Sequence, residues 1–251
     1  MRELEYWIDK NFIKEMYSSD YWNDIENEKS KEWWIDNSSD KKVINFLKSE
    51  GLLEEFELAI SESNIKGKII DVAAGTCWTS ALLSKIKTVS EIDVVEFSYH
   101  RISELAKLTI ASLGGDLNKI NRYLGSFYDI KKPDEHYDIV MLSQAYHHAE
   151  FPLKLFHECD RVLKKGGQMI IIGEHIIDYK RVFGRFIKNL FKFKFKFHIF
   201  SEYYNQNIDA LGDHYYMEGD YRFTFNSYGY SFKSIKSPVR NSTIFIITKE
   251  K

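Results

Sequence analysis

The sequence predicts an α/β protein built around a doubly wound, mostly parallel sheet of seven strands. Short apolar runs alternate with helical patterns along the middle of the chain, as in parallel strands joined by crossover helices. Residues 68–85 (KIIDVAAGTCWTSALLSK) pass from an apolar strand through small residues into a helix, where such sheets receive nucleotide-like ligands. The last two strands, 231–237 and 243–249, are joined by a connection too short for a crossover, so we expect them to be antiparallel.

Length and composition limit the class of protein. A chain of 251 residues, 44% of them hydrophobic, is long enough for one sizeable domain with a full core. Its net charge of −2 argues against a nucleic-acid partner, which usually needs a basic protein. The two cysteines form neither a disulfide framework nor a zinc spacing. The first residues are too charged for a signal peptide, and no apolar run approaches the roughly 20 residues that span a bilayer. We therefore expect a cytoplasmic protein.

The elements follow one another in a regular order. A helical, aromatic N-terminal cap is expected over residues 1–45, either packed on the main domain (46–251) or also closing over its active site. A helix with a possible break at Gly51 covers 40–62. The expected strands are 68–72, 92–95, 121–125, 137–143 and 168–173, and the helices between them are 80–87, 99–113 and 151–163. Residues 175–215 break the pattern, which predicts a lid-like insertion after the fifth strand.

Acidic residues follow the first two strands of this sheet. Asp71 lies at the end of the first strand, and Glu96 ends the second strand 25 residues later. An acidic side chain at the tip of the second strand is placed to accept hydrogen bonds from both ribose hydroxyls of a bound nucleoside. Together with the small-residue turn after Asp71, Glu96 indicates a nucleoside-containing ligand.

Four motifs together resemble one family. They are a strand followed by Asp71 and a small-residue turn with Gly75, a strand ending in Glu96, the run YDIVMLS followed by QAYHH, and RVLKKGG at residues 161–167. In these motifs the sequence resembles the class I S-adenosylmethionine-dependent methyltransferases that act on small molecules. The resemblance covers residues 60–175 and the closing hairpin. It implies a Rossmann-like fold, S-adenosylmethionine as the cofactor and S-adenosylhomocysteine as its product.

The resemblance also implies a role for individual residues. Asp71, Ala73 and Gly75 would surround the methionine part of the cofactor, Glu96 would bind the ribose, Phe97, Ser126 and Phe127 would border the adenine, and Gln144 would face the reacting centre. The family's usual glycine triplet appears here as Ala73, Gly75 and Cys77, and we expect a slightly altered but competent loop. The acidic residue usual near Ser126 is absent, and Lys165 replaces the usual proline. A turn that binds a dinucleotide pyrophosphate is the competing interpretation, which bulky Trp78 at the helix start disfavours.

Methyl transfer is an in-line displacement at a sulfonium methyl group, so the protein chiefly positions the acceptor and supplies a base. We expect no metal. The candidate bases are the histidines that follow the fourth and fifth strands or precede the last helix: His147, His148, His175 and His214. The simpler interpretation of the adjacent pair is that at least one of these rings packs structurally.

The insertion is rich in basic and aromatic residues. Seven Lys or Arg side chains lie between residues 180 and 196, with phenylalanines between them and no acidic residue. The simplest interpretation is a solvated cationic face. A second is a lid that recognises a small anionic acceptor, such as a phosphorylated or nucleotide-linked sugar precursor. The residues predicted to contact that acceptor are Tyr146, Arg181, Arg185 and Tyr215.

Two further alternatives remain open. The basic patch is also compatible with a surface that rests on an anionic membrane and brings the enzyme to a quinone or lipid, although the alternation of Phe and Lys over residues 191–197 favours a strand over an interfacial helix. A domain that binds the cofactor without turnover and serves a protein partner is the other alternative. The sequence indicates no oligomeric state.

Overall fold

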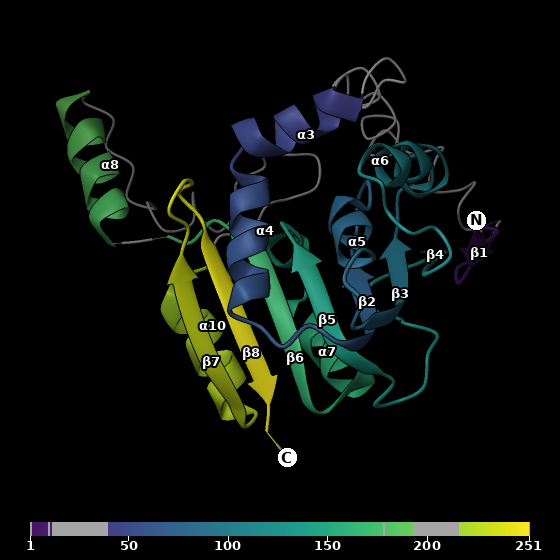
Figure 1. Ribbon diagram of the computed structural model, residues 1–251. Coiled ribbons are helices and arrows are strands. Elements are labelled where there is room, and N and C mark those ends of the chain that lie inside the picture. Colours follow the sequence, from purple (N-terminus) through teal and green to yellow (C-terminus); the bar gives the residue numbers. More distant parts are fainter. Residues whose placement is uncertain (1, 10, 12–39, 178, 193–215, 251) are drawn as a thin grey trace.

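Eight strands form one sheet in the order β1-β4-β3-β2-β5-β6-β8-β7 in the computed structural model (Figure 1). The structure describes residues 2–9, 11, 40–177, 179–192 and 216–250. The strands are β1 (Glu5–Tyr6), β2 (Gly67–Val72), β3 (Val89–Glu96), β4 (Ile120–Leu124), β5 (Tyr137–Ser143), β6 (Leu163–Glu174), β7 (Tyr230–Lys236) and β8 (Thr243–Lys249). Neighbours from β1 to β6 are parallel, and β8 runs antiparallel to both β6 and β7.

The predicted parallel sheet with a closing antiparallel hairpin is confirmed, but the predicted count of seven strands is one too low. The additional strand, β1, pairs Glu5 with Tyr123 and Tyr6 with Leu124 along the outer edge of β4. It escapes a sequence prediction because it has only two residues, both exposed, and therefore no apolar run. It lies within the predicted helical N-terminal cap, most of which, residues 12–39, lies outside the described residues.

Helices cover both faces of the sheet. One face carries α3 (Asp40–Ser49), α4 (Leu52–Ser61), α5 (Trp78–Leu83), the π-helical turn η2 (Arg101–Leu105) and α6 (Ala106–Ser112). The other face carries α7 (Pro152–Val162) and α10 (Glu218–Ser227). In Figure 1 the first group lies in front of the sheet and the second behind it, while α8 (Tyr179–Phe191) extends away from the sheet.

The central strands are apolar on both faces because helices cover both. On β2, Ile69 belongs to the core beneath α3 to α6, whereas Ile70 belongs to the core beneath α7 and α10. On β5, Ile139 and Val140 divide in the same way. This packing explains why the strand signal in the sequence was a continuous apolar run rather than an alternation.

The predicted break at Gly51 is confirmed. Gly51 separates α3 from α4 with φ of 66°, a left-handed conformation that glycine adopts without the steric cost of a Cβ. The break lets α4 turn and pack its buried face against β6 and β8. It also brings Gly51 against Val239 and Arg240 in the β7–β8 connection.

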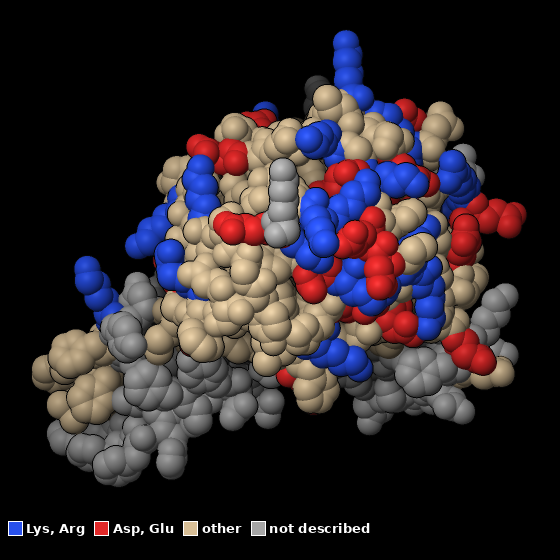
Figure 2. Space-filling view, turned by 90° about the horizontal axis from the view of Figure 1, so that it is seen from below, with Lys and Arg blue, Asp and Glu red and all other residues tan. Residues whose placement is uncertain are grey.

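The carboxyl ends of β2, β3, β5 and β6 meet at one edge of the sheet, and the β7–β8 connection joins them there because Glu174 pairs with Thr243. The opposite edge is seen in Figure 2, where Lys and Arg side chains intermingle with Asp and Glu. Ion pairs such as Lys68–Glu91 and Lys164–Asp138 lie there, at the amino ends of the strands. No single-sign patch covers the described part of this visible face.

Candidate active site at the carboxyl edge of the sheet

The loop between β2 and α5 has an unusual backbone. Ala73, Gly75 and Cys77 all have positive φ, at 52°, 54° and 63°. These are the three positions at which the resembled family has glycine. A left-handed conformation costs a residue with a Cβ about 1–2 kcal/mol, so Ala73 and Cys77 are held in strained conformations by the surrounding structure. The loop keeps its left-handed path without two of its glycines.

Asp71 anchors this loop from below. Its Oδ2 accepts hydrogen bonds from the hydroxyl groups of Thr79, at 2.5 Å, and Ser80, both in the first turns of α5. Its other oxygen, Oδ1, is buried and has no hydrogen-bond partner among the described residues. Burial raises the pKa of Asp71 to about 6, against the opposing effect of the two hydroxyl donors. Asp71 therefore presents one unsatisfied carboxylate oxygen beneath the loop.

Glu96 joins the first two loops at this edge. Its Oε2 accepts the N–H of Gly75 at 2.7 Å, and its Oε1 accepts the N–H groups of Phe97 and Ser98 at 2.8 Å each. The carboxylate is thus fixed by three backbone donors. Beside it, a Cβ placed on Gly75 would meet no atom within 4 Å, so the outer side of the loop is open to a ligand. The residues present therefore fit a cofactor that carries a ribose and a cationic amino acid.

The third loop, after β4, provides aromatic groups. Ser126 accepts the N–H of Tyr128 through its Oγ at 3.1 Å, and the rings of Phe127 and Tyr128 lie 4.5 Å apart, edge to face. From the N-terminal segment, Trp7 stacks on Tyr123 with 4.1 Å between ring centroids and touches the end of β4. The structure therefore places Ser126, Phe127 and half-buried Phe97 after neighbouring strands, and their role as an adenine border stays a prediction.

Gln144 follows β5 and contacts two other chain segments. It has φ of 51°, and its N–H donates to the carbonyl of Ile172 at 2.8 Å. Its Oε1 accepts a hydrogen bond from Nη2 of Arg240 at 3.4 Å. Arg240 also lies 3.6 Å from the buried carboxylate of Glu55. Arg240 was not predicted as a site residue, because only the pairing of β8 with β6 brings the β7–β8 connection to this edge.

The histidines gather between β5 and β6. Nδ1 of His147 lies 3.2 Å from Oε1 of Glu174, and the hydroxyl of Tyr221 donates to the other oxygen of Glu174 at 2.8 Å. Glu174 is fully buried. Ring centroids of His148 and His175 lie 4.3 and 6.4 Å from that of His147. The predicted histidines 147, 148 and 175 are thus brought together, with Glu174 as an orienting partner.

The remaining predicted residues are placed differently. Tyr146 is buried, donates its hydroxyl proton to the carbonyl of Pro152 at 3.1 Å and packs on Tyr221, and burial raises the pKa of its phenol. Arg181 and Arg185 belong to α8, but their side chains are outside the described residues, as are His214, Tyr215 and the Phe/Lys run from 193 onward. On α8, Lys180 and Lys188 are exposed, and so are Phe183 and Phe186.

The described part of the chain contains no group of three or more His, Cys, Asp and Glu side chains suited to hold a metal ion. None of its helices is both long and apolar enough to cross a membrane.

The comparisons with known proteins agree with this geometry. Residues 70–171 match a family model described as a methyltransferase domain. No curated protein matches the sequence. Among solved structures, the fold is similar to a chain from the complex between the Haloferax volcanii Trm112 methyltransferase activator and a putative methyltransferase (12% identity, 84% of this chain and 95% of that chain, TM-score 0.62).

Two further structures are similar in fold. One is a putative methyltransferase from Bacillus halodurans (15% identity, 79% of this chain and 100% of that chain, TM-score 0.60). The other is a putative S-adenosyl-L-methionine-dependent methyltransferase from Methanococcus maripaludis (21% identity, 85% and 94%, TM-score 0.53). The match of residues 70–171 to the methyltransferase-domain model and the shared fold of these structures confirm the resemblance to class I S-adenosylmethionine-dependent methyltransferases.

Proposed function

We propose that this protein, acting in the cytoplasm, transfers a methyl group from S-adenosylmethionine to an oxygen or nitrogen atom of a small anionic acceptor. A phosphorylated or nucleotide-linked sugar precursor is the acceptor class that we favour. The observation that carries the proposal is the 2.7 Å hydrogen bond from Gly75 to Glu96, which joins the open loop to the carboxylate at the second strand. When bound, S-adenosylmethionine supplies an electrophilic methyl group, and the residues around it hold the acceptor and receive its proton.

His147 is our candidate base. The carboxylate of Glu174, held by the hydroxyl of Tyr221, accepts a hydrogen bond from Nδ1–H of His147. In this tautomer Nε2 carries the lone pair of the ring. A neutral imidazole with that tautomer is suited to take the proton of an acceptor hydroxyl or ammonium group. Glu174 and Tyr221 act through His147, so they are positioning residues. His148 and His175 remain predicted alternatives.

The pH profile of kcat tests the base. His147→Gln should lower kcat by about a hundredfold or more, the usual contribution of a general base, with unchanged affinity for S-adenosylhomocysteine. Glu174→Gln should lower kcat less and shift the pH profile, because the imidazole loses its charged partner. The control is His157→Gln, on the exposed side of α7. If His147→Gln keeps the wild-type kcat and either His148→Gln or His175→Gln lowers it, the base is the histidine whose replacement lowers kcat.

An anionic acceptor is supported by the cations near this edge. Arg240 lies beside Gln144, with its Nη1 3.6 Å from the carboxylate of Glu55, and exposed Lys180 and Lys188 lie on α8, the helix that follows β6 in the chain. With Arg181 and Arg185, α8 would form one side of the acceptor site. Replacing Arg181, Arg185 and Lys188 by Gln should raise the acceptor KM and leave cofactor affinity unchanged.

A panel of acceptors separates the proposal from its alternatives, with formation of S-adenosylhomocysteine as the readout. The proposal expects turnover with phosphorylated or nucleotide-linked sugars and little with their neutral counterparts. Turnover only with quinones or lipids, together with sedimentation on anionic vesicles, would favour the membrane alternative. Tight cofactor binding with no turnover and a stable protein partner would favour a non-catalytic role.

A further inference from the structure

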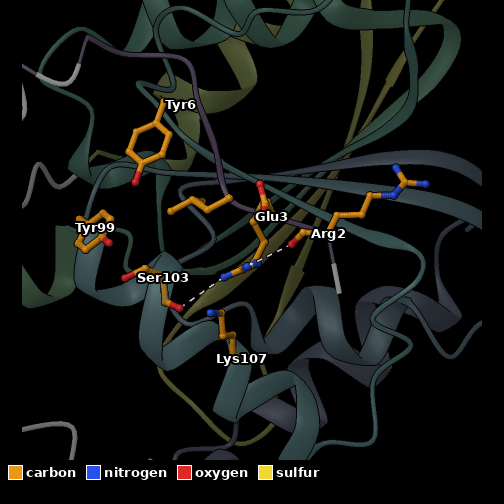
Figure 3. A pocket seen from close by; sticks show the side chains of 8 residues that line it. Arg2, Glu3, Tyr6, Tyr99, Ser103 and Lys107 are labelled. Atoms are coloured by element: carbon orange, nitrogen blue, oxygen red, sulfur yellow. Dashed lines mark hydrogen bonds between the residues drawn. The ribbon is translucent and has the colours of Figure 1, made fainter.

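A cavity lies between the N-terminal segment and the π-helical turn η2, and none of its lining residues is assigned to the methyl-transfer site. It has a volume of about 270 Å³. Its walls come from β1 and the residues before it, from η2 and α6, and from β4. The lining residues are Arg2, Glu3, Leu4, Tyr6, Tyr99, Ser103, Lys107 and Arg122 (Figure 3). The cavity is slightly smaller than the roughly 300–1,000 Å³ typical of drug-sized ligands, which suits a small one.

Arg122 is the deepest charge in this cavity. Only 3% of its surface is exposed, and no carboxylate in the described part of the chain pairs with it. Nη1 donates to the carbonyl of Ile102 at 2.8 Å. Nη1 also donates to the carbonyl of Ser103 at 3.5 Å, and Nη2 donates to the carbonyl of Arg2 at 3.4 Å; Figure 3 draws these two bonds as dashed lines. Its Nε has no hydrogen-bond partner among the described residues.

A buried guanidinium without a counter-ion is unfavourable, because carbonyl dipoles replace only part of the lost hydration. Burial accordingly lowers the pKa of Arg122. Native proteins usually compensate such a charge with a carboxylate, and none of the described residues supplies one to Arg122. A bound anion would supply the missing negative charge.

Other groups of the cavity suit the same anion. The Lys107 side chain points toward the middle of the cavity in Figure 3, and no carboxylate among the described residues pairs with it. The hydroxyl of Ser103 is buried and has no hydrogen-bond partner within the described residues. Glu3 lines the cavity but forms no ion pair with Arg122 or Lys107 in the described chain. Tyr6 and Tyr99 close one side.

We propose that this cavity is a binding site for a phosphate-sized oxyanion, held by Arg122, Lys107 and the hydroxyl of Ser103. Guanidinium, ammonium and hydroxyl donors are the groups that recognise phosphate and carboxylate oxygens. The oxyanion is either a free ion or the phosphate or carboxylate group of a small metabolite. The site lies on the α6 face at the outer edge of the sheet, four strands from β6.

Binding would fasten the N-terminal segment to the domain. β1 is joined to β4 by only two residue pairs, followed by the bond from the N–H of Trp7 to the carbonyl of Leu124 at 2.9 Å. Residues 2–6 form one wall of the cavity. An anion bound between β4 and α6 would hold this wall against the domain. Amide exchange at Trp7 should therefore slow when the anion is bound, because local opening of β1 becomes less frequent.

Titration of the 251-residue chain with inorganic phosphate tests the proposal. Saturating S-adenosylhomocysteine is present throughout so that the methyl-transfer site is filled, and sodium chloride of matched ionic strength is the blank. The amide NMR signals of Ser103 and Lys107 should shift saturably, and amide exchange at Trp7 should slow. Lys107→Gln should weaken the affinity by about tenfold, as expected for one charge-assisted contact. Lys165→Gln, an equal loss of charge at an exposed position near the start of β6, should leave it unchanged.

Arg122→Lys and Ser103→Ala provide second variants, because a larger change at buried Arg122 risks misfolding. Both should weaken phosphate binding while the unliganded protein remains folded. A parallel titration with acetate and with glucose 6-phosphate distinguishes a carboxylate, a free phosphate and a phosphate carried by a larger molecule. Equal phosphate affinity in wild type and Lys107→Gln, or shifts reproduced by chloride, would overturn the proposal.

Discussion

The backbone of Gly173 lies against the side chain of Gln144, so that a Cβ on Gly173 would overlap Cγ of Gln144. The two residues end neighbouring strands and both have positive φ, 77° and 51°. Gln144 therefore keeps its position, which we propose to face the reacting centre, only while residue 173 has no side chain. The hydrogen bond that Arg240 donates to Gln144 depends on that position as well.

Gly173→Ala should lower kcat by about tenfold or more, because the new methyl group displaces Gln144 from the reacting centre. The matched control is Gly166→Ala. Gly166 has a similar φ of 74°, but a Cβ there meets no atom within 4 Å. Both variants lose about 1–2 kcal/mol of stability from the left-handed conformation, measured by urea unfolding. Equal kcat in the two variants would show that Gln144 is not held in place by Gly173.

Ala73→Gly should stabilise the protein by about 0.5–1 kcal/mol, because glycine removes the strain of φ at 52°. The neighbouring Ala74→Gly has no positive φ to relieve and should destabilise instead. Chemical unfolding of both variants measures the difference. A loss of stability in Ala73→Gly would contradict the left-handed path of this loop.

Asp71 should make stability depend on pH below neutrality. Its pKa is about 6 in the folded protein and 3.8 for the unperturbed side chain, because burial disfavours the charged form. The folded state therefore binds the proton more tightly. The resulting stabilisation is present below about pH 4 and is lost as the pH rises through about 6, a change of about 3 kcal/mol.

Asp71→Asn removes this titration. The melting temperature of wild type relative to Asp71→Asn should fall between about pH 4 and about pH 6.5 and then level. Differential scanning calorimetry across that range gives the comparison. A pH-independent difference would mean that Asp71 stays ionised in the fold.

Arg240→Gln should raise the acceptor KM by about tenfold and leave the affinity for S-adenosylhomocysteine unchanged, because a charged contact to the acceptor is lost. The same change leaves the buried carboxylate of Glu55 without its cation, so stability should also fall. The double variant Arg240→Gln with Glu55→Gln recovers stability while the raised KM persists. An unchanged KM in either variant would assign Arg240 a structural role alone.

The central fold was predictable because its signals are local. The strands β2, β5 and β8 are continuous apolar runs, and Gly51 marks the α3–α4 break by its conformational freedom. Crossover helix α5 (Trp78–Leu83) starts and ends earlier than the predicted 80–87, since apolar spacing alone does not show where a helix of six residues stops. The strand β1 has no such signal.

The site was predictable only where a motif carries it. Asp71 and Glu96 lie at strand ends that the pattern identifies, but the positive φ of Ala73 and Cys77 contradicts their own preferences and is imposed by the fold. The partnership of His147 with Glu174 and Tyr221 joins β5, β6 and α10. Arg240 reaches Gln144 across 96 residues of sequence. Contacts of this kind depend on tertiary packing, which no local pattern records.

The central claim is that Glu96, fixed by the N–H of Gly75, binds the ribose of S-adenosylmethionine, and calorimetric titration with S-adenosylhomocysteine tests it most directly. The control variant is Glu91→Ala, at the other end of β3, where the carboxylate pairs with Lys68. The account predicts saturable binding to wild type and Glu91→Ala, and at least about tenfold weaker binding to Glu96→Ala. No binding to wild type, or equal affinity in all three proteins, would contradict it.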